Sequence, residues 1–271
     1  MFEGEARAAG GAVRSLPLAF TAGAAIGLLG GMIGLGGAEF RLPLLIAVFG
    51  FVALQAVIVN KAMSLIVVLT ALPARLLAVP FSEVASHWDV VVNLLAGSLV
   101  GAWAGATWAT RMRSATLYKV LAALLVLIAA ALTATHLGPV GTLELPSAVQ
   151  MVAGLVAGVL IGIVAALMGV AGGELLIPTI VLLYGLDIKL AGSLSLAVSL
   201  PTMLVAFARY SQDASFQVLR DNRGFVLTMT VGSVVGTVLG GLLLGIVPGS
   251  VIVPLLVTLL LVSALKVWRH Q

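Results

Sequence analysis

The chain is a succession of long apolar stretches separated by short polar interruptions. Most stretches approach the length of about 20 residues that a helix needs to cross the hydrocarbon core of a bilayer. They lack the alternation of apolar and polar residues typical of membrane barrel strands, so the pattern predicts helices. The predicted segments are residues 16–35, 40–58, 61–79, 90–110, 115–135, 148–169, 175–186, 190–208, 225–247 and 250–268.

Composition extends this interpretation to the whole chain. Of 271 residues, 61% are hydrophobic and 9% are charged, whereas soluble domains carry about 25% charged residues. No interruption between the apolar segments is long enough for a soluble domain. The predicted fold is therefore all-α, a polytopic transmembrane helical bundle in which about 8–10 segments enter the membrane and some are broken or re-entrant.

The two halves of the chain repeat each other at a constant offset of 135 positions. In one ungapped register, Glu39 matches Glu174 and Pro43 matches Pro178. Glycine-rich membrane sequences produce chance matches, but a glutamate and a proline that align together indicate a real duplication. Further matched pairs are Gly27 with Gly162, Gly34 with Gly169, Gly37 with Gly172, Gly50 with Gly185, Ser64 with Ser199, Gly97 with Gly232, Ser98 with Ser233, Gly101 with Gly236 and Gly105 with Gly240.

Each copy has an odd number of crossings, whether its five segments all span or its first two form a re-entrant hairpin. An odd number inverts the second copy relative to the first, as in many secondary transporters. Basic and acidic loops fall on opposite sides, so the positive-inside rule predicts cytoplasmic termini. Arg41 fits this topology poorly, because the topology places it near the outer side of the membrane or inside the protein. The predicted parts are a cytoplasmic N-terminal tail (1–15), the first transmembrane repeat (16–136), an inter-repeat loop (137–147) and the second transmembrane repeat (148–271).

Two glycine-rich motifs, GLGGAEFRLP at 34–43 and GVAGGELLIP at 169–178, interrupt the apolar segments. The glycines break or turn a helix, and the proline is best tolerated in the first turn of a new helix. Free backbone N–H groups at such a break carry partial positive charge and bind anions. Two breaks related by inversion would meet at the centre of the protein and form one site.

The glutamates of these motifs admit two interpretations. Glu39 and Glu174 either cap the new helices and complement their dipoles, or mark an ion or proton pathway, as carboxylates inside a membrane often do. Both can hold, because a cap can also take up a proton. The two residues are therefore candidates for proton coupling as well as for substrate binding.

Other polar residues lie inside apolar segments. They either complete an anion site or bond helix backbones together, and Lys61 is equally well explained as a cytoplasmic anchor. The glycine runs at 97, 101 and 105 and at 232, 236 and 240 favour close helix packing. The candidate substrate-binding residues are Gly34, Gly36, Gly37, Ala38, Glu39, Asn60, Lys61, Ser64, Gly169, Gly172, Gly173, Glu174, Ser195 and Ser199.

Several functional classes find no support in the sequence. There is no H-E-x-x-H, G-x-S-x-G or Walker A motif, so no enzyme activity is expected. The absence of cysteine removes thiolate chemistry, and neither a cofactor nor a metal is expected. A net charge of +4 without a large basic cluster argues against nucleic acid. The expected partners are membrane lipid and a small anionic substrate, and a homo-oligomer is left open.

The duplicated pattern G-x-[GA]-G-[AG]-E-x-x-x-P, followed in the second copy by AGSLSLAVSLP, resembles the TauE/SafE family of membrane permeases, also called the sulfite exporter family. The resemblance implies transport of a small sulfur-containing anion across the bacterial inner membrane. The family's glycine positions fall on Gly34, Gly36, Gly37, Gly169, Gly172 and Gly173. The chain departs from the family pattern at Ala38, Arg41, Lys61 and Ala171.

Together, the residues and the resemblance predict a secondary transporter for sulfite, thiosulfate or an organosulfonate. The anion would bind at the paired helix breaks near the midplane. Because no ATP site is present, an ion gradient, such as that of protons, or the substrate's own gradient would drive transport. A passive anion channel and a permease for a small carboxylate remain alternatives. The direction of transport does not follow from the sequence.

Overall fold

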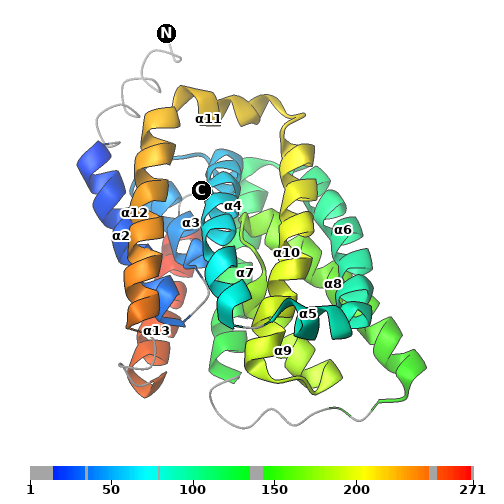
Figure 1. Cartoon of the computed structure of the whole chain (residues 1–271). Coiled ribbons are helices and arrows are strands. Elements are labelled where there is room, and N and C mark those ends of the chain that lie inside the picture. Colours follow the sequence, from blue (N-terminus) through cyan, green and yellow to red (C-terminus); the bar gives the residue numbers. More distant parts are fainter. Residues whose placement is uncertain are drawn as a thin grey trace.

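The computed structural model describes residues 15–33, 36–78, 80–134, 143, 145–243 and 249–269. Within these residues the chain forms helices and no strands, which confirms the all-α prediction (Figure 1). The predicted N-terminal tail and inter-repeat loop lie largely outside the described residues. The elements are α2 (Leu16–Ile33), α3 (Ala38–Ala47), α4 (Ala53–Ala78), α5 (Phe81–Ser86), α6 (Trp88–Arg111), α7 (Ser114–Ala134), α8 (Ser147–Met168), α9 (Gly173–Tyr184), α10 (Ile188–Tyr210), the 3-10 helix η1 (Ala214–Gln217), α11 (Val218–Asp221), α12 (Arg223–Leu242) and α13 (Gly249–Trp268).

Among the described residues, six helices are long and apolar enough to cross a membrane, by length and composition: α4, α6, α7, α8, α10 and α12. The chain is therefore a polytopic membrane bundle. The second helix of each repeat is much shorter, with 10 residues in α3 and 12 in α9. These helices extend about 15 and 18 Å, less than the hydrocarbon core of about 30 Å. Each is the returning arm of a hairpin with the helix before it.

The segment boundary predicted between residues 58 and 61 is wrong. α3 ends early, Gly50 turns the chain with a φ of 66°, and α4 then continues unbroken for 26 residues. Asn60 and Lys61 lie inside α4, and both are fully buried. The helix does not end at these polar residues because other helices supply their hydrogen bonds. This polar pair marks the protein interior, and Lys61 is not a cytoplasmic anchor.

The two repeats are interlocked through faces of small residues. α2 packs in parallel against α12, and α8 packs in parallel against α6, so each pair joins one repeat to the other. An added Cβ on Gly236 would lie 2.1 Å from the carbonyl oxygen of Ala24, and one on Gly101 would lie 2.0 Å from that of Val159. Backbones this close require glycine, so the predicted packing role of the glycine runs is confirmed.

The course of the chain shows that the repeats are inverted. In Figure 1, α2 begins at the upper left and runs downward, whereas its counterpart α8 begins at the lower right and runs upward. The first hairpin, α2 with α3, therefore enters the bundle from one side. The second hairpin, α8 with α9, enters from the other. The two helix breaks at the tips of these hairpins reach the interior of the bundle.

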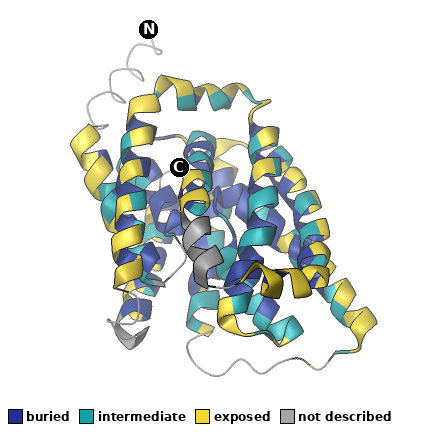
Figure 2. Cartoon of the chain, in the orientation of Figure 1, coloured by how far each residue is buried: buried dark blue, intermediate teal, exposed yellow. Residues whose placement is uncertain are grey.

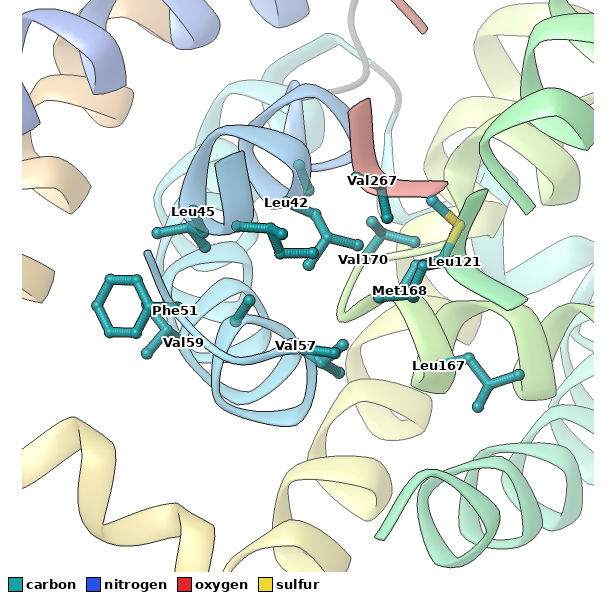
Figure 3. Packing of buried hydrophobic residues seen from close by; sticks show 14 of the residues in the cluster. Leu42, Leu45, Phe51, Val57, Val59, Leu121, Leu167, Met168, Val170 and Val267 are labelled. Atoms are coloured by element: carbon teal, nitrogen blue, oxygen red, sulfur yellow. The ribbon is translucent and has the colours of Figure 1, made fainter. Parts of the chain in front are cut away.

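Burial increases toward the region where the hairpins meet (Figure 2). Outward faces carry exposed apolar side chains such as Leu160 and Val238, as expected for helices that contact lipid. Figure 3 shows Leu42 of α3 with Val57 of α4 and Met168 of α8, which belong to one buried cluster. This apolar core holds both breaks against α4.

The interlocking faces predict a sharp difference between two neighbouring glycines of α12. A Cβ on Gly240 would lie 2.2 Å from the carbonyl oxygen of Leu28, whereas one on Gly241 would meet nothing within 4 Å. We expect Gly240→Ala to lower the free energy of unfolding by about 1–3 kcal/mol through overpacking. Gly241→Ala should be neutral. Thermal unfolding of the two purified variants measures the difference, and equal midpoints would contradict the close backbone contact.

Candidate functional site

The first helix break is built around Gly36 and Gly37. Their φ angles are 81° and 70°, a conformation that residues with a Cβ rarely adopt. A Cβ on Gly37 would also lie 2.6 Å from the carbonyl oxygen of Ile26, so α2 and α3 meet backbone to backbone. α3 then begins, with Glu39 in its first turn. Gly34, also predicted for the site, lies outside the described residues.

The second break has the same construction. Gly169, with a φ of 69°, ends α8, and Gly172, with a φ of 85°, precedes α9. Gly173 and Glu174 are the first two residues of α9. In each copy a helix is thus followed by a break and a second helix whose N-terminal end faces the interior.

The prolines lie deeper in the new helices than predicted. Pro43 and Pro178 are inside α3 and α9, each in the sixth position and not in the first turn. A proline lacks the N–H group that would bond to the carbonyl four residues earlier. The carbonyls that lose this usual partner belong to Glu39 and Glu174. At each break, the same glutamate therefore carries both the side-chain carboxyl group and a backbone carbonyl that lacks its usual N–H partner.

Asn60 of α4 ties the two breaks together. Its Nδ2 donates to the carbonyl oxygen of Ala38 at the first break and to that of Met168 at the second, each at 3.0 Å. Its Oδ1 accepts a hydrogen bond from Nε of Arg41 at 2.8 Å. Both amide N–H groups and one oxygen lone pair are used. A single buried side chain thereby connects α3, α4 and α8.

Arg41 of α3 is fully buried beside Asn60. Its Nη2 donates to Oγ of Ser64 at 2.7 Å, and its Nη1 donates to Oγ of Ser233 at 3.2 Å. Ser64 and Ser233 belong to different repeats, and all three acceptors of Arg41 are uncharged. The poor fit of Arg41 to the predicted topology is explained, because the cation lies inside the protein. Since a guanidinium stays protonated, the centre of the bundle carries a fixed positive charge.

Lys61 holds the second break closed. Its Nζ donates to the carbonyl oxygens of Val170 at 2.6 Å and Ala165 at 2.9 Å. Ala165 lies in the last turn of α8 and Val170 just beyond the end of this helix, where the helix dipole favours a cation. Nearby, Oη of Tyr210 donates to the carbonyl oxygen of Ala166 at 2.9 Å. Lys61 is thus engaged with the backbone, whereas the hydrogen bonds of Arg41 within the described residues go to side chains.

Glu39 and Glu174 are neighbours, because the carboxyl group of each acts on that of the other. Glu39 is 1% exposed, and Glu174 is partly exposed. In the described part of the chain, Oε2 of each residue is buried and has no hydrogen-bond partner. The first turns of α3 and α9 therefore bring together two carboxyl groups that are incompletely bonded by the protein.

The second repeat does not reproduce the cluster of cations. In the repeat register, leucines take the places of Arg41 and Lys61. Ser195 and Ser199 are buried in α10, and the Ser195 hydroxyl donates to the carbonyl oxygen of Gly192 in its own helix at 2.8 Å. This bond matches the backbone-bonding alternative that the sequence left open for these serines. Glu39, Arg41, Asn60, Lys61, Ser64, Glu174 and Ser233 form the polar centre of the bundle. This polar centre is asymmetric although the helices around it are duplicated.

Two residues of the polar centre were not among the predicted site residues. Arg41 is a charge inside an apolar motif, which is itself a signal for function, but in the sequence it stands out as a misfit in topology and a departure from the family pattern. Ser233 is matched by Ser98 in the repeat, yet its partner Arg41 is 192 positions away. No local pattern connects residues that far apart.

A family model described as sulfite exporter TauE/SafE matches residues 18–267, nearly the whole chain. Neither the curated proteins nor the solved structures contain a match to the chain. The family match covers both hairpins and all the residues of the polar centre.

Proposed function

The chain belongs to the sulfite exporter TauE/SafE family of membrane transporters, and we propose that it carries a small sulfur-containing anion across the bacterial inner membrane. Sulfite, thiosulfate and small organosulfonates are the proposed substrates. The anion binds between the two helix breaks, next to Arg41. An ion gradient, most simply that of protons, drives its movement.

The observation that carries this proposal is the buried guanidinium of Arg41. A buried charge is costly, and among the described residues the hydrogen bonds of Arg41 go to Asn60, Ser64 and Ser233, which are neutral, so no carboxylate bonds directly to the guanidinium. A guanidinium has five N–H donors, so three protein acceptors leave two donors for a substrate. The oxygens of a sulfur oxyanion suit such paired donors, and the N-terminal ends of α3 and α9 add partial positive charge.

The burial of the centre favours a carrier over a channel. Arg41, Asn60 and Lys61 are each 0% exposed, so these three side chains are closed off from solvent. Access requires a movement that separates packed elements. The bond between Arg41 and Ser233, at 3.2 Å, joins α3 of one repeat to α12 of the other. Breaking it during a rocking movement of the repeats would open the centre toward one side, as alternating access requires.

Uptake into proteoliposomes tests the proposed function. Labelled sulfite, thiosulfate and methanesulfonate are supplied separately, each with and without an imposed pH gradient. We expect at least one of these anions to accumulate above equilibrium only when the gradient is present, because a coupled carrier stores the energy of the gradient in its substrate. Protein-free liposomes provide the control for leakage.

Other outcomes would contradict parts of the proposal. Absence of flux for all three anions, with protein shown to be folded and inserted, would reject the substrate class. Uptake of a small carboxylate instead would identify a carboxylate permease. Potential-driven currents faster than a carrier cycle, without accumulation, would identify a passive channel.

A further inference from the structure

We propose that Glu39 and Glu174, one from each repeat, form a single shared proton site that fills when the anion binds, so that anion and proton cross together. The inference rests on the proposed function for the anion and adds the residues, the stoichiometry and the direction of coupling. The chemical step is the reversible binding of one proton by a carboxylate oxygen.

The geometry of the pair supports one site instead of two. The carboxyl groups come from symmetry-related positions at the first turns of α3 and α9 and are neighbours. When both are ionised they repel each other. One proton placed between them replaces the repulsion with a hydrogen bond, which is why adjacent carboxyl pairs share protons. Their titration then belongs to the pair and not to either residue.

Unfilled bonding capacity at the pair is an independent indication. In the described residues, Oε2 of Glu39 and Oε2 of Glu174 are buried without a hydrogen-bond partner, although buried polar atoms are normally bonded. A carboxylate oxygen is only an acceptor, whereas its protonated form also donates. Proton binding is therefore the change that would supply the missing donor at this place.

The charges around the pair come from both sides of the break. Arg41 of α3 acts on Glu39, and Lys61 of α4 acts on Glu174. Of the other helices packed against α3 and α9, α2 and α8 contain no charged residue. α7, α10 and α13 carry their charges toward helix ends, at Lys119, Lys189, Arg209 and Lys266. The tyrosines of these elements, Tyr118, Tyr184 and Tyr210, are uncharged near neutral pH.

This charge balance explains the coupling. Two cations and two ionised carboxylates sum to zero, so the centre offers no net charge to an anion. One bound proton leaves a net charge of +1 from the same four groups, which a monovalent anion neutralises. The anion and an ionised pair would also compete for the same helix N-termini. Each ligand therefore favours the other, and the favourable effect is reciprocal by linkage.

The test follows proton and anion movement together in proteoliposomes, with methanesulfonate as the anion. A sulfonate does not take up a proton near neutral pH, so any proton that moves with it is carried by the protein. Labelled flux and internal acidification, reported by an entrapped pH dye, are recorded with the membrane potential clamped. We expect wild-type protein to carry about one proton per anion. Anion flux without proton flux would overturn the shared site.

Two variants test whether the pair acts as a unit. In Glu39→Gln and Glu174→Gln, the new amide donates to the remaining carboxylate and imitates the shared-proton state permanently. We expect both variants to lose gradient-driven accumulation to the same extent, by about 10-fold or more, within the usual range for coupled sites. Glu83→Gln, the same substitution at an exposed position in α5, should keep wild-type coupling. Wild-type coupling in either Glu39→Gln or Glu174→Gln would overturn the proposal.

Infrared difference spectra of the purified protein between low and high pH provide a measurement that needs no transport. Wild-type protein should show a carboxylic acid C=O band that is lost in Glu39→Gln and in Glu174→Gln. Persistence of the band in either variant would assign the proton to one residue and overturn the shared site. If the band behaves as expected while no sulfur anion is transported, the proton site stands and the proposed function fails.

Discussion

Arg41→Gln should reduce transport of a sulfur anion by about 100-fold or more, because loss of one partner of a buried charged interaction typically costs about 3–5 kcal/mol. Glutamine still reaches part of the network of Asn60, Ser64 and Ser233 but supplies no positive charge. Initial rates of labelled uptake in proteoliposomes, normalised to inserted protein, measure the effect.

A second substitution at the same position separates charge from geometry. Arg41→Lys keeps the cation but cannot donate to Asn60, Ser64 and Ser233 at once, since an ammonium is a compact point charge and a guanidinium is a planar fork. We expect a smaller loss, about 10-fold, which corresponds to about 1.4 kcal/mol. Arg111→Gln, at an exposed helix end, is the matched control and should transport normally. A folded Arg41→Gln variant with the wild-type rate would show that Arg41 does not bind the anion.

Asn60→Leu should lower the free energy of unfolding by about 3–6 kcal/mol, because three buried partners each lose a bond worth about 1–2 kcal/mol when left unsatisfied. The partners are Nε of Arg41 and the carbonyl oxygens of Ala38 and Met168. Thermal unfolding in detergent measures the change. Asn93→Leu provides the control, since Asn93 is partly buried and, among the described residues, its side chain bonds to Tyr184 at 2.8 Å. Equal losses in the two variants would contradict the bridging role of Asn60.

Asn60→Asp tests how an added negative charge beside Arg41 affects transport. The aspartate keeps an acceptor for Arg41 but loses both donors to the backbone carbonyls. Its carboxylate would also pair with Arg41 and compete with the transported anion. We expect this variant to be more stable than Asn60→Leu and yet to transport poorly. Transport at the wild-type rate would show that a carboxylate bonded directly to Arg41 does not impair transport.

Much of the architecture could be predicted because the relevant signals are local. Apolar segments of bilayer length identify a membrane bundle whatever their partners are. The glycines of the two motifs mark the breaks because their backbone conformation, with φ between 69° and 85° at Gly37, Gly169 and Gly172, suits a residue without a Cβ. The duplication of 135 positions predicts inversion from parity alone.

The sequence predicts a helix boundary near residue 60 that the structure does not have, and it leaves two explanations of Lys61 open. Lys61 follows an apolar stretch and is compatible with a membrane surface, and only its bonds to Ala165 and Val170 show that it is buried. The continuation of α4 through Asn60 could not be predicted for the same reason. A polar residue within an apolar stretch ends a helix or remains inside it according to whether another element supplies its hydrogen bonds.

The sequence by itself determined the membrane class, the all-helical fold, the duplicated and inverted plan and the positions of the two breaks, because composition and backbone preference act over short distances along the chain. The tertiary structure alone decided that the repeats interlock through α2 with α12 and α6 with α8. It also decided that Arg41 bonds to Ser233, 192 positions away. Those relations arise when distant segments exclude water together and must satisfy each other's polar groups.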